Sequence, residues 1–194
     1  MEQDQGRRTV LWRHVDEAGI EYCVLARGGG AWLLEGTVVM PLAGRPGRVT
    51  YAVRCDDQWR TRGVEVLVSD GVAERSLTLS VDDEQRWWRG PDEVADWRGL
   101  SDVDLGVTPA TNTLPIRRLP LHAGEGRDVT AAWVRFPDLR LERLPQRYTR
   151  VDDDRYRYES DGGRFVAELE VDDLGLVTRY ENGWERIATI DAPR

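Results

Sequence analysis

Apolar and polar residues alternate with a period of two along most of the chain. The clearest case is four short segments near the C-terminus, at residues 155–159, 165–171, 176–181 and 184–190. Such alternation places one side of a segment on a buried face and the other in solvent, which is typical of half-buried strands. Asp161-Gly162-Gly163 and Asn182-Gly183 separate these segments, and an Asn-Gly pair suits a type I′ hairpin turn. The pattern therefore predicts a four-stranded meander.

The same pattern predicts further strands at residues 10–14, 20–27, 31–39, 49–56, 64–69, 77–81, 129–136 and 139–148. Turn residues lie between them at 28–30, 45–47 and 70–71. Many strands at this spacing favour an all-β fold, a large antiparallel curved sheet or incomplete β-barrel with little helix. A helical signal is confined to residues 91–97 and 113–119, and Pro115 interrupts the second of these.

The length of 194 residues suits a single domain over 1–194, ordered over about 8–191, which buries roughly 70% of its unfolded surface. The charged start, MEQDQGRR, lacks the apolar region of a signal peptide, and no stretch approaches the ~20 apolar residues of a membrane span. We therefore expect a cytoplasmic protein with no integral membrane segment. Cys23 and Cys55 lie in alternating segments and are expected to be reduced, buried thiols.

The charged residues exclude several classes of protein. All 27 basic residues are Arg, and without Lys there is no Schiff-base chemistry and no phosphate-loop lysine, so PLP enzymes and P-loop NTPases are excluded. The net charge of −8 disfavours nucleic-acid binding, which needs a clustered basic face. The sequence holds two His and none of the hydrolase or zinc-protease motifs. We expect no cofactor and no metal, and an enzyme is less favoured than a binding protein.

The segment from Ser101 to Leu121 fits neither a strand nor a tight turn, and we predict an ordered loop packed on the sheet. Asp102 and Asp104 are two residues apart, so extended backbone points both carboxylates the same way, as an acid/base pair or metal ligands require. The alternative is an ion pair with Arg117 or Arg118 of the same loop.

Hydroxyl and amide side chains are frequent in the same loop, at Thr108, Thr111, Asn112 and Thr113. They could bind a sugar or phosphate head group, or they could hydrogen-bond the backbone of the loop itself. The sequence leaves both interpretations open.

Eight Trp residues are spread over most of the predicted strands. They could wall an apolar cavity on the concave side of the sheet, or they could fill the core. Trp59 and Arg62, three residues apart, are interpreted as a stacked pair, with an anion-binding Arg as the alternative.

Several longer blocks carry a family resemblance over nearly the whole chain. They are CDDQWRTR (55–62), DVDLGVTPATNTLPIRRL (102–119), AAWVRFPDL (131–139), QRY (146–148), YRYES (156–160) and GLVTRYENGWERI (175–187). On these blocks the chain resembles the bacterial family called putative glycolipid-binding proteins. The resemblance implies an incomplete antiparallel β-barrel, similar to the bacterial lipoprotein carriers that shelter acyl chains in a hydrophobic hollow.

Our leading hypothesis is a non-enzymatic cytoplasmic binding protein for an amphiphile, such as a glycolipid or another acyl-chain molecule. The alternatives are an enzyme of unknown reaction that uses Asp102 and Asp104 near arginines, and an interaction or self-associating module that pairs through an open sheet edge. The ligand-binding candidates are the wall residues Tyr51, Trp59, Trp88, Trp133 and Tyr148 and the polar residues Arg62, Asp102, Asp104, Thr111, Asn112, Arg117, Arg118 and Arg135.

Two structural predictions follow from this hypothesis. A partly buried apolar cavity of a few hundred Å³, the lower range for ligand sites, is expected to open on the concave face with at least two Trp in its wall. The loop should border its mouth, with Asp102 or Asp104 in ion-pairing reach of Arg117, Arg118 or Arg62, because a buried unpaired ion is costly.

Overall fold

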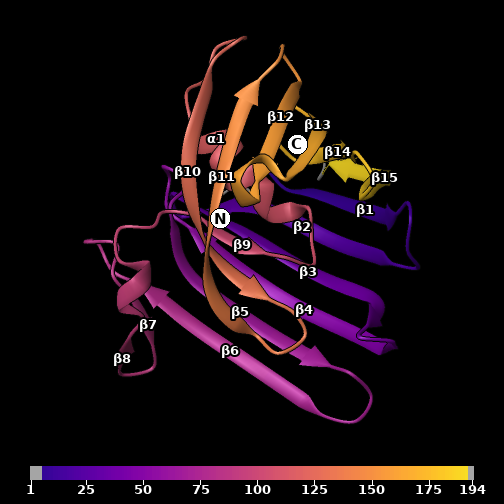
Figure 1. Ribbon diagram of the computed structural model, residues 1–194, viewed down its shortest axis with the longest axis vertical. Helices are drawn as coiled ribbons and strands as arrows, with labels where there is room; N and C mark the ends of the chain where they lie inside the picture. Colours follow the sequence, from indigo (N-terminus) through magenta and orange to yellow (C-terminus); the bar gives the residue numbers. More distant parts are fainter. Residues whose placement is uncertain (1–5, 192–194) are drawn as a thin grey trace.

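The computed structural model describes residues 6–191, and fifteen strands of that part form one open sheet (Figure 1). The strands are β1 (Arg8–His14), β2 (Ile20–Gly28), β3 (Ala31–Leu42), β4 (Arg45–Cys55), β5 (Thr61–Ser69), β6 (Glu74–Val81), β7 (Trp87–Arg89), β8 (Asp92–Glu93), β9 (Val103–Leu105), β10 (Gly126–Arg135), β11 (Arg140–Arg150), β12 (Arg155–Ser160), β13 (Phe165–Val171), β14 (Val177–Tyr180) and β15 (Trp184–Asp191). The helical elements are α1 (Thr113–Arg118) and the 3-10 turns η1 (Ala95–Trp97), η2 (Ala110–Asn112) and η3 (Asp161–Gly163).

The order across the sheet is β8-β7-β6-β5-β4-β3-β2-β1-β15-β14-β13-β12-β11-β10-β9. The chain thus runs from the centre to one edge, crosses to the other edge at β9, and returns until β15 pairs with β1. The first half is drawn in indigo to magenta and the second in orange to yellow in Figure 1. Neighbours are antiparallel except for the parallel pair β9 and β10. The predicted all-β curved sheet is confirmed, and it is not closed into a barrel.

Each of the twelve predicted strands is present, with ends that differ by a few residues. The three short strands β7, β8 and β9 were not predicted, because two or three residues are too few to display an alternation. Of these, β8 and β9 are the two edge strands of the sheet.

Two predicted turns differ from the structure. Residues 45–47 begin β4, and the turn lies instead at Ala43 and Gly44, whose φ angles of 50° and 76° suit a hairpin turn with two left-handed positions. At Asn182-Gly183 the hairpin is confirmed, but the type I′ turn is wrong: residues 181–183 make the connection, and of the pair only Asn182 has a positive φ, 56°.

The predicted helical segment at 113–119 is confirmed as α1 in spite of Pro115. Proline is tolerated in the first turn of a helix because the backbone N–H groups there have no intrahelical partner. The segment at 91–97 forms the short strand β8 and then η1. Within residues 6–191 we find no helix with the length and apolar character needed to cross a membrane.

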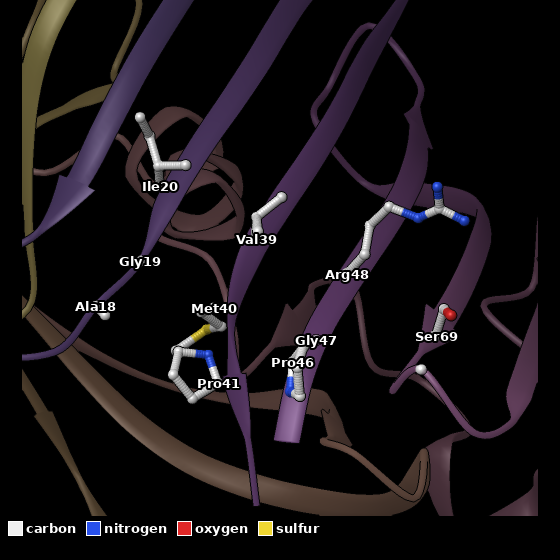
Figure 2. Close-up of a pocket in the computed structure, with 11 residues that line it drawn as sticks. Ala18, Gly19, Ile20, Val39, Met40, Pro41, Pro46, Gly47, Arg48 and Ser69 are labelled. Carbon is white, nitrogen blue, oxygen red and sulfur yellow. The ribbon is translucent and has the colours of Figure 1, made fainter. Parts of the chain in front are cut away.

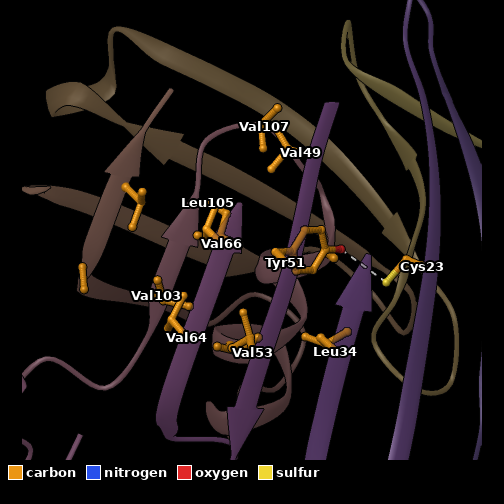
Figure 3. Packing of buried hydrophobic residues seen from close by; sticks show 14 of the residues in the cluster. Cys23, Leu34, Val49, Tyr51, Val53, Val64, Val66, Val103, Leu105 and Val107 are labelled. Atoms are coloured by element: carbon orange, nitrogen blue, oxygen red, sulfur yellow. Dashed lines mark hydrogen bonds between the residues drawn. The ribbon is translucent and has the colours of Figure 1, made fainter. Parts of the chain in front are cut away.

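The main core lies between the inner face of β1–β7 and the segment 101–121. Val49, Tyr51 and Val53 alternate along β4 on the buried side, and Val103 and Leu105 belong to the same cluster (Figure 3). Leu114 of α1 packs in this cluster, whereas Ile116 packs in a second cluster on β11–β14. The loop therefore fills much of the space that the curved sheet encloses.

Most Trp side chains serve the core. Trp12, Trp87 and Trp97 are fully buried, and their indole N–H groups each donate to a backbone carbonyl, as Trp12 does to Val177 at 2.8 Å. A buried indole needs such a partner, so these three residues are core filling.

Candidate functional site

A pocket of about 360 Å³ lies where the loop meets the ends of the C-terminal hairpins. The loop contributes Asp104, Gly106, Thr108, Pro109 and Asn112; β10 and β11 contribute Trp133 and Leu144; the hairpins and β1 contribute Tyr158, Ser160, Phe165, Tyr180, Asn182, Gly183, Trp184 and His14. Its wall therefore combines aromatic rings with carboxyl, amide and hydroxyl groups. The volume and the two Trp in the wall fit the predicted cavity, but the wall is not the apolar one that was predicted. The loop fills much of the hollow where the cavity was expected.

Asp104 is placed in this pocket by the parallel pairing of β9 with β10. In that register Asp104 lies opposite Trp133, while its neighbours Val103 and Leu105 are buried in the main core. The Nε2 group of Gln146 donates to Asp104 Oδ2 at 2.5 Å and is also 3.0 Å from the hydroxyl of Tyr158. Burial raises the pKa of Asp104 to about 6, so this carboxyl changes its protonation state close to neutral pH.

Asp102 has a different role, because Arg118 neutralises it. Nε and Nη2 of Arg118 donate to the two carboxylate oxygens of Asp102 at 2.9 and 2.5 Å, and the Asp102 side chain is 2% exposed. The prediction of an ion pair in this loop is confirmed. A bidentate buried pair fixes the loop, and it leaves Asp104 as the carboxyl that faces the pocket.

The hydroxyl and amide side chains of the loop mostly form hydrogen bonds with other groups of the same loop. Thr111 Oγ1 accepts from the backbone N–H of Leu105 at 3.3 Å. The hydroxyl of Tyr148 donates to Asn112 Oδ1 at 2.8 Å, and Asn112 Nδ2 donates to the carbonyl of Pro109 at 3.2 Å. Tyr148 thus orients the Asn112 amide at the pocket wall without lining the pocket.

Glu21 is a buried acid next to the pocket that the sequence reasoning missed. Its Oε1 atom accepts hydrogen bonds from the hydroxyls of Tyr51 at 2.5 Å and Thr108 at 2.7 Å, and Oε2 has no partner among the described residues. Burial raises the pKa of Glu21 to about 8, so the carboxyl is mostly neutral at pH 7. The alternation in this segment could have predicted its burial, because Glu21 lies on the same side of the strand as the buried residues Cys23 and Leu25.

His14 was also missed. Its Nδ1 atom accepts from the backbone N–H groups of Asp16 at 3.3 Å and Glu17 at 3.0 Å, which leaves the proton of a neutral ring on Nε2. The ring meets that of Trp184 edge to face, with centroids 5.0 Å apart. The two rings form one side of the pocket.

Other candidates lie away from the pocket. Trp59 stacks on Trp32 with centroids 4.3 Å apart, and Arg117, not Arg62, lies over its ring at 5.7 Å. The predicted Trp59 and Arg62 pair is therefore wrong: Arg62 instead forms an ion pair with Asp56 at 2.9 Å.

Arg135 and Trp88 complete the candidate set. Arg135 lies over Trp133 at 4.8 Å and pairs with Glu142 at 3.2 Å. It therefore contacts the pocket residue Trp133 but does not line the pocket itself. Trp88 lies on β7, near the opposite edge of the sheet, with Arg86 over its ring at 5.8 Å.

A second hollow, an open groove of about 740 Å³, lies on the outer face of the sheet at the ends of β2–β5 (Figure 2). Ile20 and Val39 line it and are 43% and 51% exposed, whereas Glu21 and Val38, the adjacent residues on the same strands, are fully buried on the inner face. No pattern in the sequence predicted such a groove.

The fold and the pocket together define an all-β protein with a ligand-sized cavity at the rim of an open sheet. The family model described as Putative glycolipid-binding matches residues 9–186, and the chain belongs to this family. The chain is similar to the crystal structure of a DUF1089 family protein from Pseudomonas aeruginosa. The two are 31% identical, with a TM-score of 0.80, over 91% of this chain and 95% of that one. No curated protein matches the chain.

Proposed function

We propose that the protein binds an amphiphile whose hydroxyl-rich head group occupies the pocket around Asp104. The observation that carries the proposal is a carboxyl without an ion pair among the described residues, placed beside the half-buried ring of Trp133. A neutral polar head group needs a strong hydrogen-bond acceptor and does not need a cation. The Asp104 carboxyl supplies such an acceptor. Membership of a family described as Putative glycolipid-binding supports a head group of this kind.

The wall chemistry suits a sugar. A pyranose ring has apolar faces that pack on aromatic rings, and hydroxyls at its rim that need donors and acceptors. Trp133, Phe165 and Tyr180 offer ring surfaces, and Asp104 and Ser160 offer polar atoms. About 360 Å³ is at the lower end of ligand sites, which fits a head group of one or two rings.

Binding is favoured over catalysis because the two loop carboxylates are not equivalent. Hydrolysis of a glycoside commonly needs two carboxyl groups on either side of the scissile bond, and Asp102 is held by Arg118. The cytoplasmic location predicted from the sequence is part of the proposal, and the two buried cysteines, both free thiols, agree with it.

Native mass spectrometry of the protein purified from its own host, followed by calorimetric titration of the glycolipid it retains, tests the proposal. We expect Trp133→Ala and Asp104→Asn each to weaken binding at least tenfold. Trp88→Ala is the matched control, because Trp88 is also partly exposed beneath an Arg and should bind as the wild type does. Equal affinity of all four proteins, or retention of no amphiphile, would remove the proposal. Turnover of the ligand would favour an enzyme instead.

A further inference from the structure

The groove on the outer face presents an uncovered aliphatic row. Ile20 of β2 pairs directly with Val39 of β3, and Val39 pairs with Arg48 of β4, so the three side chains stand side by side about 4.8 Å apart. Figure 2 shows them on three neighbouring strands. Because Ile20 and Val39 are about half exposed, contact with an apolar ligand would remove further apolar area from water.

The lining offers little to a polar partner. Arg48 is the one ionised side chain among the described residues that line the groove. Pro41 and Pro46 form a cross-strand pair, and neither has a backbone N–H to donate. Such a surface suits an alkyl chain better than a peptide, which would need hydrogen-bonding partners for its backbone.

Gly19, a residue of the groove, lies next to residues that line the pocket. A Cβ atom built at Gly19 would lie 3.3 Å from Cβ of Met40, which also lines the groove. It would lie 3.2 Å from Cβ of His14 and 3.6 Å from the ring of Trp184, both of which line the pocket. Gly19, which has no side chain, therefore lies between lining residues of the two hollows.

We infer that the groove holds a single alkyl chain of the same molecule whose head group enters the pocket. The inference rests on the proposed function and adds where the apolar part of the ligand binds. The pocket has room for a head group only, and a chain that leaves it over Gly19 meets Met40, Ile20 and Val39 in turn. At the far end the methylenes of Arg48 extend the apolar surface, while its guanidinium stays in water.

Calorimetric titration with methyl and octyl glycosides of glucose, galactose and mannose, below the concentration at which the octyl compounds form micelles, tests the inference. Each methylene that enters the groove should tighten binding about two- to fourfold, so the octyl form of a sugar that binds should bind at least tenfold more tightly than its methyl form. Val39→Asp should abolish this gain and leave the affinity for the methyl form unchanged. Val151→Asp is the matched control, at a Val 44% exposed in the connection before β12, and should keep the gain.

The outcomes separate the two proposals. Equal binding of methyl and octyl forms overturns the alkyl-chain inference and leaves the pocket assignment standing, whereas no binding of any glycoside overturns both. Sedimentation of the wild type as a dimer and of Val39→Asp as a monomer would make the groove an interface between copies and would also overturn the inference.

Discussion

The hydroxyl of Tyr51 donates a 2.5 Å hydrogen bond to the buried carboxyl of Glu21 from a strand two places away in the sheet. To reach it, the ring of Tyr51 crosses β3 at Gly36, its direct cross-strand partner. The contact ties β2, β4 and, through Thr108, the inserted loop to one acidic side chain. Each of these residues therefore has a testable effect on stability.

Gly36→Ala should destabilise the protein by about 2 to 4 kcal/mol in urea unfolding, the sum of overpacking and a lost buried hydrogen bond. A Cβ at Gly36 would lie 2.3 Å from Tyr51 Cζ, so the ring must move away from Glu21. Gly63→Ala is the control, because its Cβ would meet neighbours at 3.7 Å, an ordinary contact. Similar losses for the two variants would contradict the role of Gly36.

Glu21→Gln should change how stability depends on pH. Burial raises the pKa of Glu21 from 4.5 to about 8 in the folded protein, so between these values the folded state binds more protons than the unfolded state. Wild-type stability then falls as pH rises from about 5 to 8, by at most about 1.4 kcal/mol per pH unit from this group. The Gln variant lacks this loss. Urea unfolding at several pH values measures it, and parallel curves for the two proteins would refute a neutral Glu21.

Asp102→Ala should cost about 3 to 5 kcal/mol of unfolding free energy, because it leaves Arg118 partly buried without its partner. Glu65→Ala removes a partner from Arg54 in an ion pair of similar length, 2.8 Å, whose side chains are both at least half exposed, and should cost at most about 1 kcal/mol. Denaturant midpoints of the two variants give the comparison. A loss for Asp102→Ala as small as that for Glu65→Ala would mean that the pair is not a structural anchor.

Binding of the head group should tighten as pH rises through about 6, where Asp104 loses its proton. An ionised acceptor makes stronger hydrogen bonds to ligand hydroxyls than a neutral acid does. Titrations between pH 5 and 7.5 should therefore show a pH-dependent affinity for the wild type and a flat, weaker one for Asp104→Asn. The same slope in both proteins would place the titrating group elsewhere.

The sequence predicted the strands well because each longer strand has one buried and one solvated face, which period-two alternation records directly. It could not place β9, whose three residues pair in parallel with a strand that begins more than twenty residues later. That pairing decides that Asp104 faces the pocket while Val103 and Leu105 face the core. Separate roles for Asp102 and Asp104 were therefore beyond reach from spacing alone.

The pocket was also predicted only in part, because long-range strand pairing brings its residues together. The loop residues Asp104 and Asn112 and the strand residue Trp133 were named in advance, but His14 and Trp184 come from opposite ends of the chain. They meet because β1 pairs with β15, with His14 opposite Trp184. A long-range register of this kind leaves no local pattern in either segment.

The pairing of β1 with β15 also sets an order on assembly. During synthesis, β15 is the last of the described strands to leave the ribosome, yet its place is in the middle of the sheet. Until it arrives, the described strands can pair only as two separate half-sheets, in which β1 and β14 are edge strands open to wrong partners. The central seam, where Arg8 lies opposite Asp191, therefore cannot form before β15 is released, and the pocket cannot be complete before it does.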